Sequence, residues 1–202
     1  MKKKKNSDLA TIEVRNASLE INTAEEENQN EMILEGYASV VNRETTLYEI
    51  DGISYKEVID REAFKNSDFS MCCMKYNHEN SVPILARVRG GSLVLEADDY
   101  GLKFKAKLFN TSSARDVYTL VKEGGLDKCS FAFTVKNSEY NSETHTRRIL
   151  EIDKVFDVSV VDIPAYEETS VQARSFFELE RKKELDKLEN EKRLKIKLLS
   201  YK

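Results

Sequence analysis

Residues 102–109, Leu-Lys-Phe-Lys-Ala-Lys-Leu-Phe, indicate the fold class of this chain. Apolar side chains alternate with lysines up to Leu108. Because successive side chains of a strand point to opposite faces, this pattern predicts a strand with one face on a core and the other in water. Such half-buried strands are typical of antiparallel sheets, so we expect a mainly β domain with a few helices.

Similar apolar patterns predict further strands on both sides of this stretch. They lie at residues 11–22 (one or two strands), 32–41, 84–89, 92–97, 129–135 and 148–162. Gly90-Gly91 between two of these runs predicts a hairpin turn, and Asp98–Gly101 predicts a second turn. One helix is expected over residues 112–123, capped by a serine and followed by Gly124. Residues 58–64 lead into a short helix or turn.

The end of the chain has a different character. Charged residues dominate from Arg174 to Lys197, and leucines occur among them at irregular intervals. This pattern predicts a helix with a thin apolar face, which docks weakly, pairs with a partner or stays exposed. We therefore divide the chain into a basic tail (residues 1–8), a β-rich domain (9–172) and a charged helical tail (173–202).

Composition argues against several classes of function. The formal net charge of −4 gives no strong attraction to nucleic acid or to an anionic membrane. No apolar run approaches the roughly 18 residues that cross a bilayer, and none follows the basic start. We therefore expect neither a membrane span nor a secretory signal, and a protein that stays in the cytoplasm. Three cysteines and two histidines, without metal-ligand spacing, predict no disulfide framework, no metal and no cofactor.

His78 and Ser130 are the candidates for chemistry. A serine hydroxyl is a poor nucleophile until a base removes its proton, and histidine is the usual base. Ser130 lies within an apolar strand, where Ala132 and Thr134 share its face while phenylalanines fill the other. This face of small residues leaves room for a substrate or for another side chain.

An acidic residue could orient the imidazole of His78. Asp157 interrupts an otherwise apolar strand, and a buried carboxylate needs a partner; the alternative is that it faces solvent at a sheet edge. His145 is the other candidate, but its neighbours are all polar, which favours a loop. We expect His78 and Ser130 to lie within hydrogen-bond distance, with Asp157 rather than His145 at the ring.

Several short segments, in this order, resemble the prohead proteases of tailed phages, capsid-maturation serine proteases grouped by fold with the herpesvirus assemblins. They are Leu34–Val40, Glu57–Phe64, Asn77–Glu79, Pro83–Arg87, Leu93–Leu102, Ser130–Phe133 and Asp157–Ala165. The resemblance covers about residues 12–172. It implies a closed or partly open antiparallel β-barrel of the assemblin type. Two positions depart from the family: it often has glutamate in place of Asp157, and it tends to carry Pro-Gly within Arg61–Phe64.

The resemblance implies that His78 is the general base, Ser130 the nucleophile and Asp157 the acid that orients the base. It implies a serine endopeptidase that cleaves the major capsid protein and its scaffold or delta domain, and also itself. The place of action would be the inside of the immature capsid, in the host bacterial cytoplasm, with the charged tail as the packaging element. Two rivals are a catalytically inactive capsid assembly or scaffolding factor with the same fold, and a β-barrel binding module with no phage role.

Overall fold

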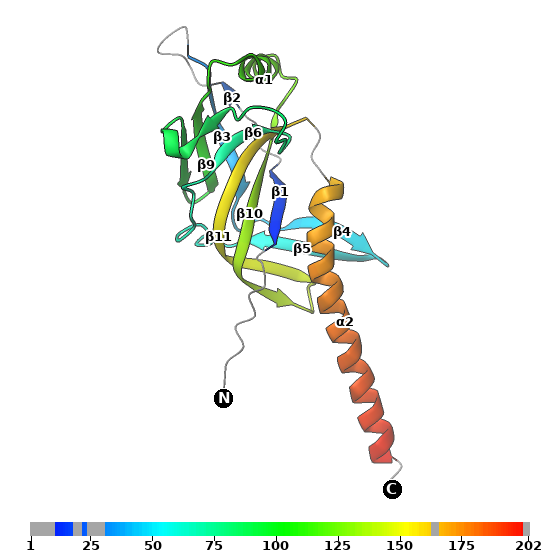
Figure 1. Ribbon diagram of the computed structural model, residues 1–202. Coiled ribbons are helices and arrows are strands. Elements are labelled where there is room, and N and C mark those ends of the chain that lie inside the picture. The colour runs from blue at the N-terminus through cyan, green and yellow to red at the C-terminus, as the bar shows by residue number, and fades with distance from the viewer. Residues whose placement is uncertain (1–10, 18–21, 24–30, 163–165, 200–202) are drawn as a thin grey trace.

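The computed structural model describes residues 11–17, 22–23, 31–162 and 166–199 (Figure 1). The expected basic tail, residues 1–8, lies outside them. In chain order the elements are β1 (Ile12–Ala17), β2 (Asn22–Thr23), β3 (Ile33–Val40), β4 (Thr45–Ile50), β5 (Ile53–Ile59), β6 (Cys73–Tyr76), β7 (Ala86–Arg87), the 3₁₀ turn η1 (Val88–Gly90), β8 (Leu93–Ala97), β9 (Gly101–Lys107), α1 (Ser112–Lys122), β10 (Lys128–Asn141), β11 (Thr146–Val161) and α2 (Tyr166–Leu199). The described chain is mainly β with two α-helices, as the alternating patterns predicted.

The strands form two sheets. The larger one has the order β1-β10-β11-β5-β4, with β6 beside β11 and β7 beside β6. The smaller one has the order β2-β3-β9-β8. The long strands β10 and β11 curve through the body of the molecule (Figure 1). Because β11 pairs with β10 along its length and with β6 near its end, it brings together segments that are far apart in the sequence.

One apolar core joins the two sheets and α1. Strand β9 contributes one face to this core, because its buried side chains alternate with exposed lysines as its sequence predicted. Leu102 and Phe104 of β9 belong to the same buried cluster as Phe131 and Phe133 of β10. Gly101 allows β9 to approach β3 closely, since a Cβ atom there would lie 1.9 Å from the carbonyl oxygen of Ser39.

The expected antiparallel barrel needs correction. Neither sheet closes on itself among the described strands, so they form two open sheets. The pairing is also mixed, because β11 runs parallel to both β5 and β6. Parallel neighbours require a long connection, and here it contains the whole chain between β6 and β11. An alternating pattern identifies the buried face of a strand, but it does not reveal the direction of a distant neighbour.

One expected hairpin is absent, and one hairpin was not expected. Gly90-Gly91 closes no hairpin, because β7 pairs with β6 in the larger sheet whereas β8 pairs with β9 in the smaller one. The η1 turn instead carries the chain between the sheets. The sequence analysis did not anticipate the β4–β5 hairpin, although Asp51-Gly52 is a strong turn signal. Both residues have a positive φ, 53° and 77°, as a type I′ turn requires.

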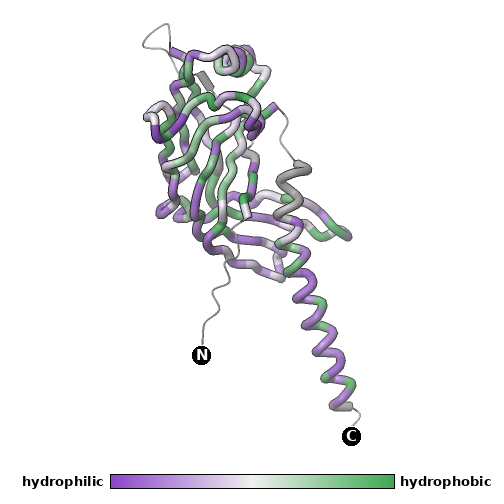
Figure 2. The backbone as a smooth tube through the Cα atoms, in the orientation of Figure 1, coloured by the Kyte–Doolittle hydropathy of each residue, from purple (hydrophilic) through white to green (hydrophobic). Residues whose placement is uncertain are grey.

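Helix α2 has a docked part and a projecting part. Phe177 is fully buried and packs against the rings of Tyr48 and Tyr55. The predicted weak docking is therefore wrong for this part of the helix. Leu185 and Leu188 further along are more than half exposed, and the end of the helix extends beyond the body as a mainly hydrophilic rod (Figure 2).

Candidate active site

Ser130 lies near the start of β10, between β1 and β11. It is opposite Asn16 on one neighbour and Ser159 on the other. Its side chain is fully buried (0% exposed), and Ala132 on the same face is buried as well. The small residues therefore create room for another side chain, the imidazole of His78, at a position covered from solvent.

The backbone around His78 turns the imidazole back towards the sheet. Strand β6 runs parallel to β11, and the amide of Asn77 extends this pairing by donating to the carbonyl oxygen of Val160 at 2.9 Å. Asn77 and His78 then both adopt left-handed backbone conformations, with φ of 50° and 56°. The side chain of Asn77 accepts a hydrogen bond from the amide of Asp162 at 3.1 Å, which ties this turn to the end of β11. Consecutive left-handed residues store strain that the surrounding structure must offset.

The three candidate side chains form a hydrogen-bonded relay. Nδ1 of His78 lies 2.6 Å from Oδ1 of Asp157, and Nε2 lies 2.8 Å from Oγ of Ser130. The neutral imidazole with its proton on Nδ1 satisfies both contacts, because Nδ1–H donates to the carboxylate and Nε2 accepts from the hydroxyl. The arrangement expected from the sequence is present, and it places the base within reach of the proton that it would remove.

Asp157 is buried on β11 and is well supplied with donors. Burial alone would raise the pKa of its carboxyl, but the hydrogen bond from His78, a second one from Ser159 and the positive charge of Lys75 lower that pKa below its ordinary value. Ser159 donates to Oδ1 at 2.9 Å, and Nζ of Lys75 lies 3.6 Å from Oδ2. The sequence analysis did not include Ser159 or Lys75. Ser159 could have been found from the period of two, which places it on the same face as Asp157.

Ser130 has a second hydrogen-bond acceptor. Its Oγ lies 3.0 Å from the backbone carbonyl oxygen of Arg15 on β1. The hydroxyl carries one proton, so donation to Arg15 competes with donation to His78. In this structure the candidate nucleophile is therefore both covered and held by its neighbouring strand.

His145 lies away from this relay, in the turn between β10 and β11. Its Nδ1 is 3.0 Å from the hydroxyl of Tyr140, and its ring packs near that of Tyr55. The structure thus places Asp157, and not His145, at the imidazole of His78. The loop expected around His145 is short, because β10 continues to Asn141 and β11 begins at Thr146.

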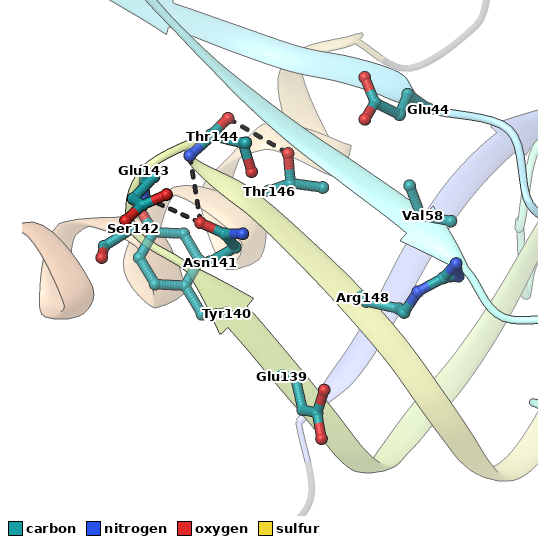
Figure 3. A pocket seen from close by; sticks show the side chains of 10 residues that line it. All are labelled: Glu44, Val58, Glu139, Tyr140, Asn141, Ser142, Glu143, Thr144, Thr146 and Arg148. Atoms are coloured by element: carbon teal, nitrogen blue, oxygen red, sulfur yellow. Dashed lines mark hydrogen bonds between the residues drawn. The ribbon is translucent and has the colours of Figure 1, made fainter.

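A separate open cavity of about 670 Å³ lies beside this turn (Figure 3). Its lining residues are Glu44, Val58, Glu139, Tyr140, Asn141, Ser142, Glu143, Thr144, Thr146 and Arg148. None of them belongs to the relay, so the cavity and the relay are different places on the molecule. Within the described residues, no group of three or more histidine, cysteine or acidic side chains could hold a metal ion, and no helix is both long and apolar enough to span a bilayer.

A serine hydroxyl, an imidazole and a carboxylate in this order form the constellation found in serine hydrolases of unrelated folds. The comparison with family models identifies one such group: the model of the caudovirus prohead serine protease family matches residues 17–184. This chain belongs to that family. The match includes all three relay residues and the docked part of α2. Comparisons with curated proteins and with solved structures gave no match.

Proposed function

We propose that this protein is a serine endopeptidase that cleaves capsid proteins during phage prohead maturation. The observation that carries the proposal is the relay in which His78 bridges Ser130 at 2.8 Å and Asp157 at 2.6 Å. Membership of the prohead serine protease family supports the class of reaction. A structural kinship with the assemblins is part of the proposal.

Acylation would begin at Ser130. Its Oγ attacks the carbonyl carbon of a peptide bond while Nε2 of His78 takes the hydroxyl proton. The imidazolium that forms is stabilised by the negative charge of Asp157, which also fixes the ring orientation. When the C–N bond breaks, Nε2 gives this proton to the leaving amine, and the acyl group stays on Ser130 as an ester.

Deacylation would repeat these steps with water. Nε2 takes a proton from the water molecule as its oxygen attacks the ester carbonyl carbon. The ester C–O bond then breaks, the new carboxyl product leaves, and the proton returns from Nε2 to Oγ of Ser130. Each cycle thus consumes one peptide bond and one water molecule and regenerates the relay.

The substrates we propose are the major capsid protein with its scaffold or delta domain, and the protease itself. Cleavage would take place inside the immature capsid in the host bacterial cytoplasm. The projecting end of α2 is the candidate for packaging, since its leucines are exposed and its backbone extends away from the β sheets (Figure 2). Because a helix without buried contacts opens easily, it is also a candidate region for self-cleavage.

The test is co-expression with the cognate capsid protein, followed by gel electrophoresis and mass spectrometry of the products. Wild-type protein should shorten the capsid protein, and Ser130→Ala should leave it intact. The Ser130→Ala change removes a hydroxyl whose one proton His78 and the Arg15 carbonyl share, and it leaves these acceptors unmet, so we expect its unfolding free energy to fall by about 1–3 kcal/mol. Undiminished cleavage by folded Ser130→Ala protein would exclude Ser130 as the nucleophile.

The rival proposal is a catalytically inactive assembly factor with the same fold. The complete burial of Ser130 favours it, because a nucleophile must reach its substrate. The same co-expression distinguishes the two. An inactive factor would change the yield or shape of assembled shells with the capsid protein uncut, and Ser130→Ala would behave as wild type.

A further inference from the structure

We propose that Ser159 is a positioning residue of this active site: its hydroxyl holds the Asp157 carboxylate beneath the imidazole of His78. This inference rests on the proposed protease function. Ser159 is fully buried (0% exposed), and its Oγ lies 2.9 Å from Oδ1 of Asp157 and 3.2 Å from Nδ1 of His78. Both polar atoms that it contacts thus belong to the relay.

The position of Ser159 follows from the pairing of β11. It lies opposite Ser130 on β10 and opposite Lys75 on β6, so it is at the centre of the strands that carry the site. Asp157, two residues earlier, shares its face. An apolar residue here would leave Oδ1 of Asp157 with one donor fewer in a buried place, where an unmet acceptor is unfavourable.

The hydroxyl of Ser159 would restrain rotation of the Asp157 carboxylate. Asp157 has two oxygens with different neighbours: Oδ1 accepts from His78 and Ser159, while Oδ2 lies 3.6 Å from Nζ of Lys75. Without the donor at Oδ1, rotation of the carboxylate towards Lys75 becomes easier. Such a rotation would weaken the bond to Nδ1 that orients the ring.

The same hydroxyl also favours the correct tautomer of His78. While Ser159 donates its proton to Asp157, its oxygen remains an acceptor 3.2 Å from Nδ1. Nδ1 therefore faces two acceptors, the carboxylate and this oxygen. A proton on Nδ1 leaves Nε2 free to receive the proton of Ser130, which is the tautomer that the reaction requires.

The first arm of the test is kinetic and uses full-length Ser159→Ala and Ser159→Thr. We expect Ser159→Ala to lower kcat by roughly 10- to 100-fold, the range that loss of outer hydrogen-bond partners produces at metal sites. KM should change little, because Ser159 contacts the relay and not the substrate. Ser159→Thr keeps the hydroxyl and should recover most of the lost kcat. An unchanged kcat in Ser159→Ala would overturn the proposal.

A matched control is Ser67→Ala. The hydroxyl of Ser67 donates to the carbonyl oxygen of Ile152 at 2.8 Å, which is a structural bond outside the relay. We expect both alanine variants to lose a similar amount of thermal stability, and only Ser159→Ala to lose turnover. Equal turnover in the two variants would show that the Ser159 bond is structural only.

The second arm does not depend on protease activity. Carbon NMR of the Asp157 carboxyl follows its titration directly in wild type and in Ser159→Ala. Lys75 and His78 face this carboxyl in both proteins, so the difference isolates the hydroxyl. We expect the pKa of Asp157 to rise in Ser159→Ala, because a donor to the ionised form is lost. If wild type cleaves no capsid protein, the proposed function falls while this titration still decides the role of Ser159; an unchanged titration would refute it.

Discussion

The backbone at Asn77 and His78 sets the direction of the imidazole. Both residues have a positive φ, and asparagine tolerates this conformation better than most other residues. The side chain of Asn77 also anchors the turn by accepting from the amide of Asp162. The site therefore depends on a residue that takes no part in the relay itself.

Asn77→Ala tests this dependence, with Asn42→Ala as its control. Asn42 has a similar φ of 54° but lies in another turn, where its amide donates to Ile59. Since alanine is unfavourable in this conformation, both variants should lose about 1–2 kcal/mol of unfolding free energy. Capsid cleavage should fall markedly in Asn77→Ala alone. Equal activity in the two variants would show that the turn does not direct His78.

Asp157 also makes the fold sensitive to acid. Its pKa is lower in the folded state than in the unfolded chain, because hydrogen bonds from His78 and Ser159 and the charge of Lys75 outweigh burial. Such a group stabilises the fold above its unfolded pKa, and the stabilisation disappears as pH falls through the folded pKa. Thermal unfolding of Asp157→Asn should therefore show a shallower decline of Tm below about pH 4, where unfolded aspartate titrates. Asp127→Asn, at an exposed position outside the relay, is the control for removing one carboxylate from the surface.

At the scale of elements, helix α2 has one part that packs against the β domain and one part that projects from it. Its docked part contributes Phe177 to a cluster with Tyr55, and its projecting part contributes almost no buried side chain. A truncation that removes Phe177 would therefore remove part of the core. A deletion that begins after Glu184 is the appropriate test of packaging, because it keeps the docked part.

Alanine substitutions along α2 should reveal this boundary. Phe177→Ala removes a fully buried ring, and we expect a loss of about 3–5 kcal/mol in unfolding free energy. Leu185→Ala removes a side chain that is 57% exposed, so the change should stay within about 0.5 kcal/mol. Urea denaturation measures both. A similar loss at Leu185 would mean that the projecting part packs against something in solution.

Elements that have a local sequence signal were predicted better than the pairing of one strand with another. The alternation of residues 102–108 and the glycine after α1 depend on neighbours within a few residues, so they were read correctly. The parallel pairing of β6 with β11 joins residues about eighty positions apart, and no local pattern encodes it. Phe177 was missed, although Phe176 stands beside it, because charged residues dominate the stretch from Arg174 to Lys197 as a whole. Ser130 and Asp157 could be identified because polar residues inside apolar strands are rare, and His78, which lies in the turn after β6, because the chain has only two histidines.

At the scale of the whole molecule, a buried network of four charges connects the N-terminal strand to the rest. The guanidinium of Arg15 lies 2.5 Å (Nη2) from Oε2 of Glu13 and 2.6 Å (Nε) from Oε1 of Glu57. Nη1 of Arg147 lies 2.8 Å from Oε2 of Glu13. Phe176 of α2 covers Arg147, with its ring centroid 4.2 Å from the guanidinium carbon. The network thus fixes β1, whose Arg15 carbonyl competes for the hydroxyl of Ser130.

Removing Arg147 from this network should lower the unfolding free energy far more than removing the adjacent, partly exposed Arg148. Arg147→Met leaves Glu13 and Glu57 undercompensated in a buried place, so we expect a loss of about 3–5 kcal/mol. Arg148→Met removes a partly exposed ion pair with Asp60, which is worth about 1 kcal/mol at most. Chemical denaturation of the two variants provides the comparison. Equal losses would mean that the network adds nothing beyond a surface pair.

The parallel pairing of β6 with β11 also imposes an order in time. A ribosome makes His78 first, Ser130 later and Asp157 last, and β6 has no β11 to pair with until residues 157–160 have been made. The docking contact at Phe177 comes later still. During synthesis the candidate nucleophile, Ser130, therefore exists before Asp157, the residue that contacts Nδ1 of His78. The three side chains of the relay therefore cannot come together before Asp157 has been made and β11 has paired with β6.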